Sequence, residues 1–391
     1  AQTAALGMFQ SLAPIPSPTP EPLLAPPYLG ETTPNLAAIS WVTRDPGGSE
    51  VRYGPNPGLG EVAAASSSLY DGKYWHAATL TGLAPGTTYH FRIYTAGQDL
   101  TPWPEATFTT APDPSATAFA FAALGDSRPW EQSQPPSQGA LDVAAQLAQQ
   151  DVDLVLHMGD IVHSGGKCLG EDSGWNQYLR GFFDLYQASA GRVPFYPAPG
   201  NHEFNGGKCG RQSYADVFSL PANAPADAQE AYYSFDWANA HFVALDTTRQ
   251  YRPGSAQYDW LVNDLQSTTQ PWILVFTHYP AYSSGHHGST APVLEHLVPV
   301  FEERGVDVVF AGHDHAYERT CPMREGACTI PEAGGVVYFV TGGGGAAPYE
   351  VRGDWFTAQA ASIYHLIRVE VDGCRLVVEA VDAAGTVFDS Y

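Results

Sequence analysis

From residue 113 onward, short apolar runs of the β type alternate with helical stretches, and many of the apolar runs end at Asp, Asn or His. This alternation predicts an α/β domain, because strands separated by helices pair side by side in a layered sheet. The polar residues should gather at the carboxyl ends of the strands, where open α/β sheets bind ligands. Five runs have this form: "TAFAFAALGD", "VDLVLHMGD", "VPFYPAPGNHE", "WILVFTHYP" and "VDVVFAGHDH".

Two further segments precede this domain. Residues 1–27 contain seven prolines, including the alternation "PIPSPTPEP", and predict an extended leader rather than a packed element. Residues 28–112 consist of short β-type runs separated by Gly, Pro and Asn turns, and "LTGLAPGTTYHFRI" and "ATFTT" resemble a fibronectin type III-like sandwich. We therefore expect an all-β sandwich over 28–112 and the α/β domain over 113–391.

Charge limits the partners that the protein can have. The chain has 18 Lys plus Arg against 41 Asp plus Glu, a net charge of −23. This charge repels nucleic acids and anionic lipid surfaces at long range, so neither is an expected partner. No apolar run approaches the roughly 18 to 20 residues of a membrane-spanning helix. The sequence opens at "AQTAALG" without an initiator Met or a signal peptide, from which we expect a processed, mature chain.

The five cysteines lack the CxxC spacing of a zinc ribbon or a redox pair. Cys321 and Cys328 flank a short loop that a disulfide could close, and Cys168 and Cys209 each end a "GGKC" quartet after a candidate ligand motif. We therefore expect two disulfides, a free Cys374 and a secreted or extracytoplasmic protein. Five reduced thiols in a cytosolic enzyme are the alternative.

Five motifs carry candidate metal ligands, in the order "LGDSR" (Asp126), "MGDIVH" (Asp160 and His163), "PGNHE" (Asn201, followed by His202), "VFTHYP" (His278) and "AGHDH" (His313 and His315). Their order resembles that of the calcineurin-like metallophosphoesterases, and more narrowly the purple acid phosphatases, whose pattern is an Asp, then GDxxY, GNHE, VxxH and GHxH. The resemblance covers residues from about 28 to 391. Five ordered motifs are specific, whereas "GD" alone would indicate nothing. The resemblance implies a four-layer αββα catalytic domain that hydrolyses phosphate esters.

The resemblance also implies a site for two metal ions. Asp160 would bridge the two ions, because one carboxylate can bind a cation with each oxygen. Zn, Mn and Fe all suit a donor set of carboxylates, one amide and several imidazoles. One ion would be bound by Asp126, Asp160, His315 and residue 163, and the other by Asp160, Asn201, His278 and His313.

The same resemblance implies how the reaction proceeds. A metal-bound hydroxide would attack phosphorus in line, so no Ser or Cys nucleophile is needed. His202 follows a ligand but does not bind metal in the family, and it is the expected general acid. Candidates to bind the substrate are His286, His287 and Arg128. The alternatives are that the two histidines of "SSGHHG" are solvated and that Arg128 forms a structural ion pair.

His163 departs from the family pattern, in which this position is a tyrosine. In other branches of the superfamily the same metal gains an imidazole two residues after the first Asp, but that residue here is Arg128, which cannot bind a metal. We therefore expect His163 to be a ligand, with a supporting role behind the ligands as the alternative. A neutral imidazole in place of a phenolate should favour divalent metals, and the protein should not be purple.

The sequence thus predicts an exported, dinuclear metal-dependent phosphatase that acts on small phosphate monoesters. A phosphodiesterase is one alternative, because the same pair of ions serves both reactions. A binding protein with a decayed phosphatase domain is an alternative from another class. The retention of every expected ligand except the tyrosine argues against it. No feature of the sequence points to an oligomeric state.

Overall fold

The computed structural model describes residues 23–131, 134–204, 209–228 and 230–391. Residues 1–22 of the expected leader lie outside these ranges. The leader was expected to extend to residue 27, but residues 23–27 belong to the first strand, β1 (Leu23–Thr33). Pro26 and Pro27 fit in this strand because β1 lies at the edge of its sheet, and its register is irregular between Ala25 and Tyr28.

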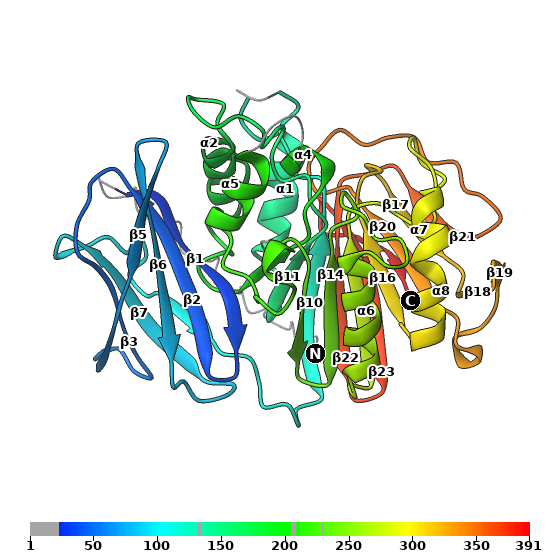
Figure 1. Ribbon diagram of the computed structural model, residues 1–391, viewed down its shortest axis with the longest axis horizontal. Helices are drawn as coiled ribbons and strands as arrows, with labels where there is room; N and C mark the ends of the chain where they lie inside the picture. The colour runs from blue at the N-terminus through cyan, green and yellow to red at the C-terminus, as the bar shows by residue number, and fades with distance from the viewer. Residues whose placement is uncertain (1–22, 132–133, 205–208, 229) are drawn as a thin grey trace, which may run out of the picture.

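Two β-sheets form the N-terminal sandwich, drawn in blue and cyan at the left of Figure 1. Trp41, Leu80 and Phe91 are buried in the core between them. This is the predicted all-β sandwich. One sheet has the order β1, β2 (Leu36–Thr43), β6 (Lys73–Thr81), β5 (Ser66–Tyr70), and the other β4 (Glu61–Ala64), β3 (Ser49–Gly54), β7 (Thr88–Thr95), β8 (Gln98–Asp99), with β9 (Thr107–Thr109) beside β7.

Two mixed sheets form the α/β part of the chain. The C-terminal hairpins extend the first of these sheets, in which β10 pairs antiparallel with β22. The first sheet has the order β12 (Phe195–Pro197), β11 (Leu154–His157), β10 (Ala118–Leu124), β22 (His365–Asp372), β23 (Arg375–Asp382), β24 (Val387–Ser390). The second has the order β13 (Tyr233–Trp237), β14 (Ala240–Leu245), β15 (Trp272–Thr277), β16 (Val308–Ala311), β20 (Val337–Thr341), β17 (Tyr317–Thr320), β21 (Thr357–Ala361).

The two mixed sheets pack face to face between layers of helices. The ring centroid of Phe121 on β10 lies 5.3 Å from that of Phe242 on β14 and 5.9 Å from that of Phe310 on β16. Helix α1 (Gln138–Leu147) covers the first sheet, and α6 (Ala256–Ser267), α7 (Ala291–His296) and α8 (Val298–Arg304) cover the second (Figure 1). This is the predicted four-layer αββα arrangement.

The segment between β11 and β13 carries α2 (Gly174–Tyr178), a π-helical turn (Leu179–Phe183), α3 (Asp184–Tyr186), α4 (Asn201–Phe204) and α5 (Cys209–Val217). Both predicted disulfides are present. Cys168–Cys209 joins the loop after β11 to the start of α5, and Cys321–Cys328 closes the small hairpin of β18 (Met323–Arg324) and β19 (Ala327–Cys328). Cys374 is an exposed free thiol. No helix in the described ranges is long and apolar enough to cross a membrane.

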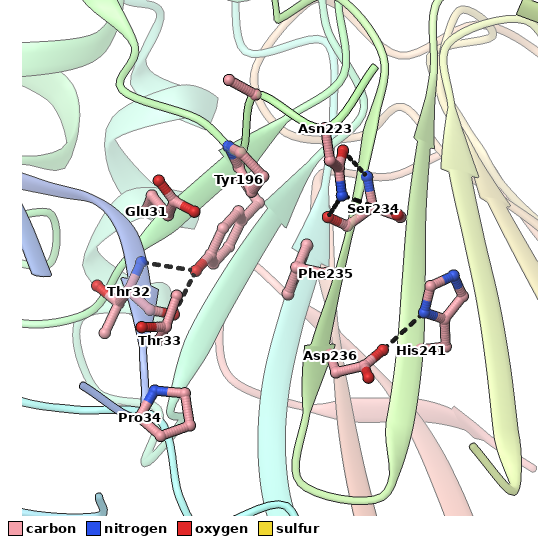
Figure 2. A pocket seen from close by; sticks show the side chains of 12 residues that line it. Glu31, Thr32, Thr33, Pro34, Tyr196, Asn223, Ser234, Phe235, Asp236 and His241 are labelled. Carbon is pink, nitrogen blue, oxygen red and sulfur yellow. Dashed lines mark hydrogen bonds and ion pairs between the residues drawn. The ribbon is translucent and has the colours of Figure 1, made fainter. Parts of the chain in front are cut away.

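The sandwich packs directly on the α/β domain. Tyr28 of β1 is buried, and its ring centroid lies 5.5 Å from that of Phe182, 5.4 Å from Phe183 and 6.1 Å from Phe218. A cavity of about 610 Å³ lies elsewhere along this junction, between the turn that joins β1 to β2 and the edge strands β12 and β13 (Figure 2). The core of the α/β domain therefore extends to sandwich residues such as Tyr28 and Trp75, while the sandwich has a core of its own.

Candidate metal centre

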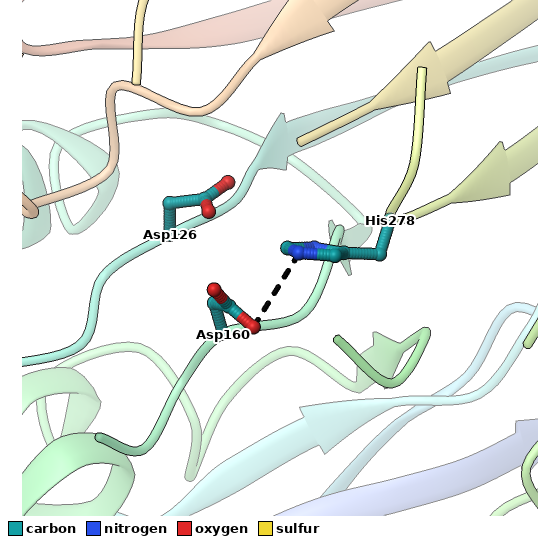
Figure 3. A group of neighbouring side chains, drawn as sticks. All are labelled: Asp126, Asp160 and His278. Atoms are coloured by element: carbon teal, nitrogen blue, oxygen red, sulfur yellow. Dashed lines mark ion pairs between the residues drawn. The ribbon is translucent and has the colours of Figure 1, made fainter. Parts of the chain in front are cut away.

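Three acidic or imidazole side chains form the centre of the site. One ligand atom from each of Asp126, Asp160 and His278 lies within 4.8 Å of the other two, and all three side chains are buried (Figure 3). Asp126 follows β10, Asp160 follows β11 and His278 follows β15. The strands β10 and β11 are parallel, as are β14, β15 and β16. The carboxyl ends of both sheets therefore deliver side chains to one place.

The backbone is left-handed at three candidate ligands, Asp126, Asp160 and His313. The φ angles are 60° at Asp126, 56° at Asp160 and 72° at His313. Such angles are uncommon for residues other than glycine and persist only where the surroundings enforce them. Gly159, at φ 81°, lets two loops meet, since a Cβ there would lie 2.4 Å from the Gly200 nitrogen. These sharp turns direct the side chains at the strand ends back into the site.

His278 is oriented by a backbone carbonyl. Its Nδ1 lies 2.7 Å from the carbonyl oxygen of Met158, which can only accept, so Nδ1 carries the proton. The lone pair of Nε2 then faces Asn201 Oδ1 at 3.0 Å and Asp160 Oδ1 at 3.4 Å. All three atoms carry a negative or partial negative charge, and none can donate to another while the proton of His278 is on Nδ1. A cation is the partner that such an arrangement lacks.

His315 repeats this arrangement on the other side. Its Nδ1 lies 3.0 Å from the Ala347 carbonyl oxygen, and its Nε2 faces Asp126 Oδ1 at 3.6 Å. That oxygen of Asp126 is buried and has no hydrogen-bond partner among the described residues. The ring of His313 lies beside that of His278, with 5.1 Å between centroids. His313 and His315 thus approach the centre from the loop after β16.

Burial governs the charges in the site. Burial, then repulsion from Asp160, raises the pKa of Asp126 well above its ordinary value. Burial lowers the pKa of His315 to about 4 and that of His313 to about 2. These imidazoles are therefore neutral near pH 7, with lone pairs free. Burial also opposes ionisation of Asp160, but the nearby His278, His202 and Arg128 and the hydrogen bond from the His202 backbone N–H outweigh it and lower the pKa of Asp160.

His202 lies at the edge of this centre. Its backbone N–H donates to Asp160 Oδ1 at 3.0 Å, and its Nδ1 donates to the carbonyl oxygen of His163 at 2.5 Å. Its Nε2 lies 3.7 Å from Asp160 Oδ2. The ring is therefore held with Nε2 towards the carboxylates.

His163 lies beside His202 rather than within the closest group. The two ring centroids are 5.7 Å apart, and His163 is not one of the residues whose ligand atoms lie within 4.8 Å of one another. Its Nδ1 is buried and has no hydrogen-bond partner among the described residues. Burial, then repulsion from His202 and Arg128, lowers the pKa of His163. The ring is thus neutral near pH 7 and offers a lone pair to a metal, but it lies outside the group of Asp126, Asp160 and His278.

The three candidate substrate-binding residues fall in two places. The Nε atom of Arg128 lies 3.6 Å from Asp160 Oδ2, and the Arg128 side chain is 9% exposed. This contact is the ion pair that was the alternative for Arg128. His286 and His287 are exposed at the rim, where the ring of His287 stacks on His313 with 4.1 Å between centroids.

Two buried carboxylates that hold the loops were missed in the sequence. Glu203 accepts hydrogen bonds from the backbone N–H groups of Asp160, Ile161 and Gly200 at 2.8, 2.8 and 2.6 Å. Asp314 accepts from the N–H of His287 at 2.7 Å. The acidic residues of "GNHE" and "GHDH" were visible in the sequence. A sequence does not show, however, which backbone N–H groups will donate to a carboxylate.

The comparisons with known proteins agree with this geometry. Residues 134–317 match the family model for the calcineurin-like phosphoesterases, and residues 27–110 match that for the purple acid phosphatase N-terminal domain. Residues 134–317 thus form a calcineurin-like phosphoesterase domain, preceded by a purple acid phosphatase N-terminal domain. Within this phosphoesterase the first match spans Asp160 to His315, while Asp126 lies ahead of it.

Two curated relatives come from Arabidopsis thaliana. The chain is 26% identical to "Probable inactive purple acid phosphatase 9" over 370 residues, which cover 79% of this chain and 55% of that protein. It is 29% identical to "Purple acid phosphatase 23" over 344 residues, which cover 74% and 73%. The chain thus spans little more than half the length of the first of these relatives. Because one is named inactive and one is not, family membership alone does not decide activity.

Solved structures share the fold. A purple acid phosphatase from yellow lupin (Lupinus luteus) seeds superposes with a TM-score of 0.82 at 24% identity, covering 93% of this chain and 73% of that one. The structure of PhoD superposes with a TM-score of 0.68 at 16% identity, covering 96% and 94%. At these identities the likeness extends to the fold and no further.

The residues present fit the metals that the family binds. Asp126 and Asp160 are two adjacent buried carboxylates, an arrangement that a bound cation stabilises and that is unfavourable without one. The imidazoles of His278 and His315 present their free Nε2 atoms to these carboxylates. Carboxylate, amide and imidazole donors are those that Zn, Mn and Fe accept.

Proposed function

We propose that the protein is a dinuclear metal-dependent phosphatase that hydrolyses small phosphate monoesters. The buried group of Asp126, Asp160 and His278 carries this proposal, because its ligand atoms face one another within 4.8 Å. One ion would be held by Asp126, Asp160, His163 and His315, and the other by Asp160, Asn201, His278 and His313. Their identity is left among Zn, Mn and Fe.

Two cations in this site would supply positive charge for the phosphate and a water acidic enough to attack phosphorus near neutral pH. The protein groups do the rest. His202 donates from Nδ1 to the His163 carbonyl oxygen, so Nε2 is the atom that can pass a proton to the departing oxygen. Arg128, 3.6 Å from Asp160 Oδ2, adds a fixed positive charge beside that carboxylate.

The rim of the site suits a small leaving group. A cavity of about 370 Å³ is lined by Ser284, Gly285, His286, Tyr349, Glu350 and Arg352. The ring of Tyr349 stacks on the ligand candidate His315 with 4.1 Å between centroids, so this cavity adjoins the metal centre. His286 lies 5.1 Å from the Tyr349 ring. These groups support a role for His286 and His287 in binding the ester rather than the metal.

The proposed setting is outside the cytoplasm. Two disulfides, Cys168–Cys209 and Cys321–Cys328, support it, since such bonds persist in oxidising compartments. A net charge of −23 disfavours nucleic acid as a substrate, so the substrate is expected to be a small phosphate ester.

The test is a paired assay on the purified protein loaded with Zn, Mn or Fe. We expect an aryl phosphate monoester to be hydrolysed faster than the corresponding diester, and a chelator to stop both reactions. Asp160→Asn should lose nearly all activity and bind less metal, because Asp160 would touch both ions. Faster diester hydrolysis would favour a phosphodiesterase. Two bound metals without turnover of either ester would identify a non-catalytic protein.

A further inference from the structure

The tip of one sandwich hairpin contacts the segment that follows the His163 motif. Strands β5 and β6 are joined at "YDGK", where Asp71 has φ 46° and Gly72 has φ 74°. Positive φ at both central residues is the type I′ turn that Asp-Gly favours. This turn places the Asp71 side chain at the end of the hairpin, which rises beside α2 in Figure 1.

The Asp71 carboxylate makes its hydrogen bonds to the α/β domain. Its Oδ1 accepts from the N–H of Gly170 at 3.2 Å. Its Oδ2 accepts from Ser173 Oγ and from Asn176 Nδ2, each at 2.7 Å. The side chain is only 13% exposed. Three hydrogen bonds to one side chain are more than a surface turn residue needs.

The neighbouring residue strengthens the same contact. The ring of Tyr70 stacks on Trp175 with 5.4 Å between centroids and 11° between planes. Trp175 Nε1 in turn donates to Asp216 Oδ2 on α5 at 3.1 Å. The hairpin tip is thus fixed by a stacked ring pair next to the Asp71 carboxylate.

The segment that Asp71 contacts leads back to the metal centre. Residues 158–173 contain turns but no helix or strand, so their conformation depends on outside contacts. Ser164, next to His163, donates its N–H to Gln177 Oε1 at 2.8 Å, and Gln177 is buried at the end of α2 near Asn176. Gly165 donates its N–H to the His202 carbonyl oxygen at 2.9 Å. A short chain of contacts therefore joins Asp71 to His163 and His202.

We propose that Asp71 is a positioning residue for the metal centre: the sandwich hairpin holds the loop of residues 163–176 in the conformation that presents His163. This inference rests on the proposed function, in which His163 is a ligand. It gives the N-terminal domain a role in metal binding without any contact between that domain and the metal. Loss of the Asp71 contacts should loosen the loop and weaken metal binding through His163.

The test compares Asp71→Asn with the native protein. Asparagine suits the turn equally well, because Asn-Gly also forms type I′ turns, so the hairpin should fold. Its amide nitrogen replaces one acceptor oxygen, which removes the hydrogen bond from either the Gly170 N–H or the Asn176 Nδ2. Glu61→Gln is the matched control, since it removes one negative charge from exposed strand β4 of the same sandwich.

Two readouts decide the matter. Hydrogen exchange of the full chain should be faster in residues 164–176 in Asp71→Asn, and unchanged in Glu61→Gln. The dissociation constant for Zn, measured by chelator competition, should rise roughly tenfold in Asp71→Asn, the lower end of the effect of groups that orient ligands. In a His163→Ala background the same substitution should no longer change that constant.

The outcomes separate this inference from the proposed function. Unchanged exchange in residues 164–176, or the same loss of Zn affinity with and without His163, would overturn the positioning role of Asp71. Unchanged Zn affinity in His163→Ala alone would instead refute His163 as a ligand, while faster exchange in Asp71→Asn would still uphold the hold of the hairpin on the loop.

Discussion

His202 is held by a backbone atom, and this decides which of its nitrogens can act. The His163 carbonyl oxygen occupies Nδ1 at 2.5 Å, which leaves Nε2 facing the carboxylate of Asp160 at 3.7 Å. In the proposed reaction, a proton on Nε2 would pass to the leaving oxygen of a bound ester. A residue with this role should affect the reaction and not the binding of metal.

We therefore expect His202→Ala to lower the rate by about 10²- to 10⁴-fold, as general acids do, with metal content unchanged. The loss should be greater for an alkyl phosphate than for an aryl phosphate, because a poor leaving group needs the proton more. The measurement is kcat on both esters, with metal content by atomic absorption. Equal losses for both esters, or loss of metal, would contradict this role.

His163 differs from the tyrosine of the related family, and the difference concerns charge. With a neutral imidazole at this position the site would have one negative charge fewer than with a phenolate. This difference would favour divalent metals. The native protein should therefore lack a purple band with any of the three metals. His163→Tyr loaded with ferric iron should gain a visible absorption band, and His163→Phe, its matched control without the hydroxyl, should not. A purple native protein would refute the assignment.

Residue identity could be read from the sequence for ligands but not for their supports. The motif letters of Asp126, Asp160 and His278 carry their chemistry wherever they occur in this order. Glu203 accepts hydrogen bonds of 2.6 to 2.8 Å from the backbone N–H groups of two loops, and those loops come together only after the chain has folded. At position 163 the sequence showed a histidine that could bind a metal, but it did not show how far this side chain lies from Asp126, Asp160 and His278.

At the scale of elements, strands β13 and β14 and helix α6 are joined by one imidazole. His241 of β14 is 7% exposed, and its two nitrogens lie 2.7 Å from Asp236 Oδ1 and 2.9 Å from Asp264 Oδ2 (Figure 2 shows the first). Burial alone would lower the pKa of His241, but the hydrogen bonds to the two carboxylates outweigh it and raise the pKa to about 9. The folded chain therefore holds this proton more tightly than the unfolded chain does.

The stability of this part of the fold should follow that proton. The stabilisation is complete below the unfolded pKa of about 6.5 and is lost as pH rises through the folded pKa of about 9. From pH 6 to 9.5 the free energy of unfolding should fall by on the order of 3 kcal/mol in the native protein. His241→Asn should show little of this fall. Urea unfolding of both proteins across that range is the measurement, and parallel pH profiles would contradict the prediction.

Elements were predictable where a pattern recurs within a few residues, and less so where the partner lies far along the chain. The strands that precede Asp126 and Asp160 can be predicted from their apolar runs. The start of β1 was hidden because Pro26 and Pro27 argue against a strand, and only the pairing with β2 at the sheet edge shows that they are tolerated there.

At the scale of the whole molecule, the sandwich is packed against the α/β domain rather than being a separate appendage. None of the candidate ligands or catalytic residues expected from the sequence lies in this domain. Asp71 and Tyr28 reach the α/β domain at two separate places, one beside the loop of His163 and one beside the π-helical turn. Neither contact can be read from the sequence, because each pairs residues that are about 100 or more positions apart.

Shared burial at Tyr28 has a thermodynamic consequence. Its ring lies against Phe182 and Phe183, and its hydroxyl accepts from the Ser219 N–H at 3.0 Å and donates to the Val217 carbonyl oxygen. Because the core of the α/β domain includes Tyr28 and other residues of the sandwich, the native protein should unfold in a single calorimetric transition. Truncation of this side chain should remove about 3 to 5 kcal/mol and weaken the link between the domains.

Tyr28→Ala should therefore split the calorimetric profile, with the sandwich melting first and the α/β domain later. Tyr28→Phe is the matched control: it keeps the ring and loses the hydroxyl, which should cost about 1 to 2 kcal/mol and leave one transition at a lower temperature. If the native protein already unfolds in two transitions, or if Tyr28→Ala merely shifts a single one, the domains are not coupled through this residue. In the first case the sandwich is thermodynamically independent, and in the second the remaining contacts, Asp71 among them, suffice to hold the two domains together.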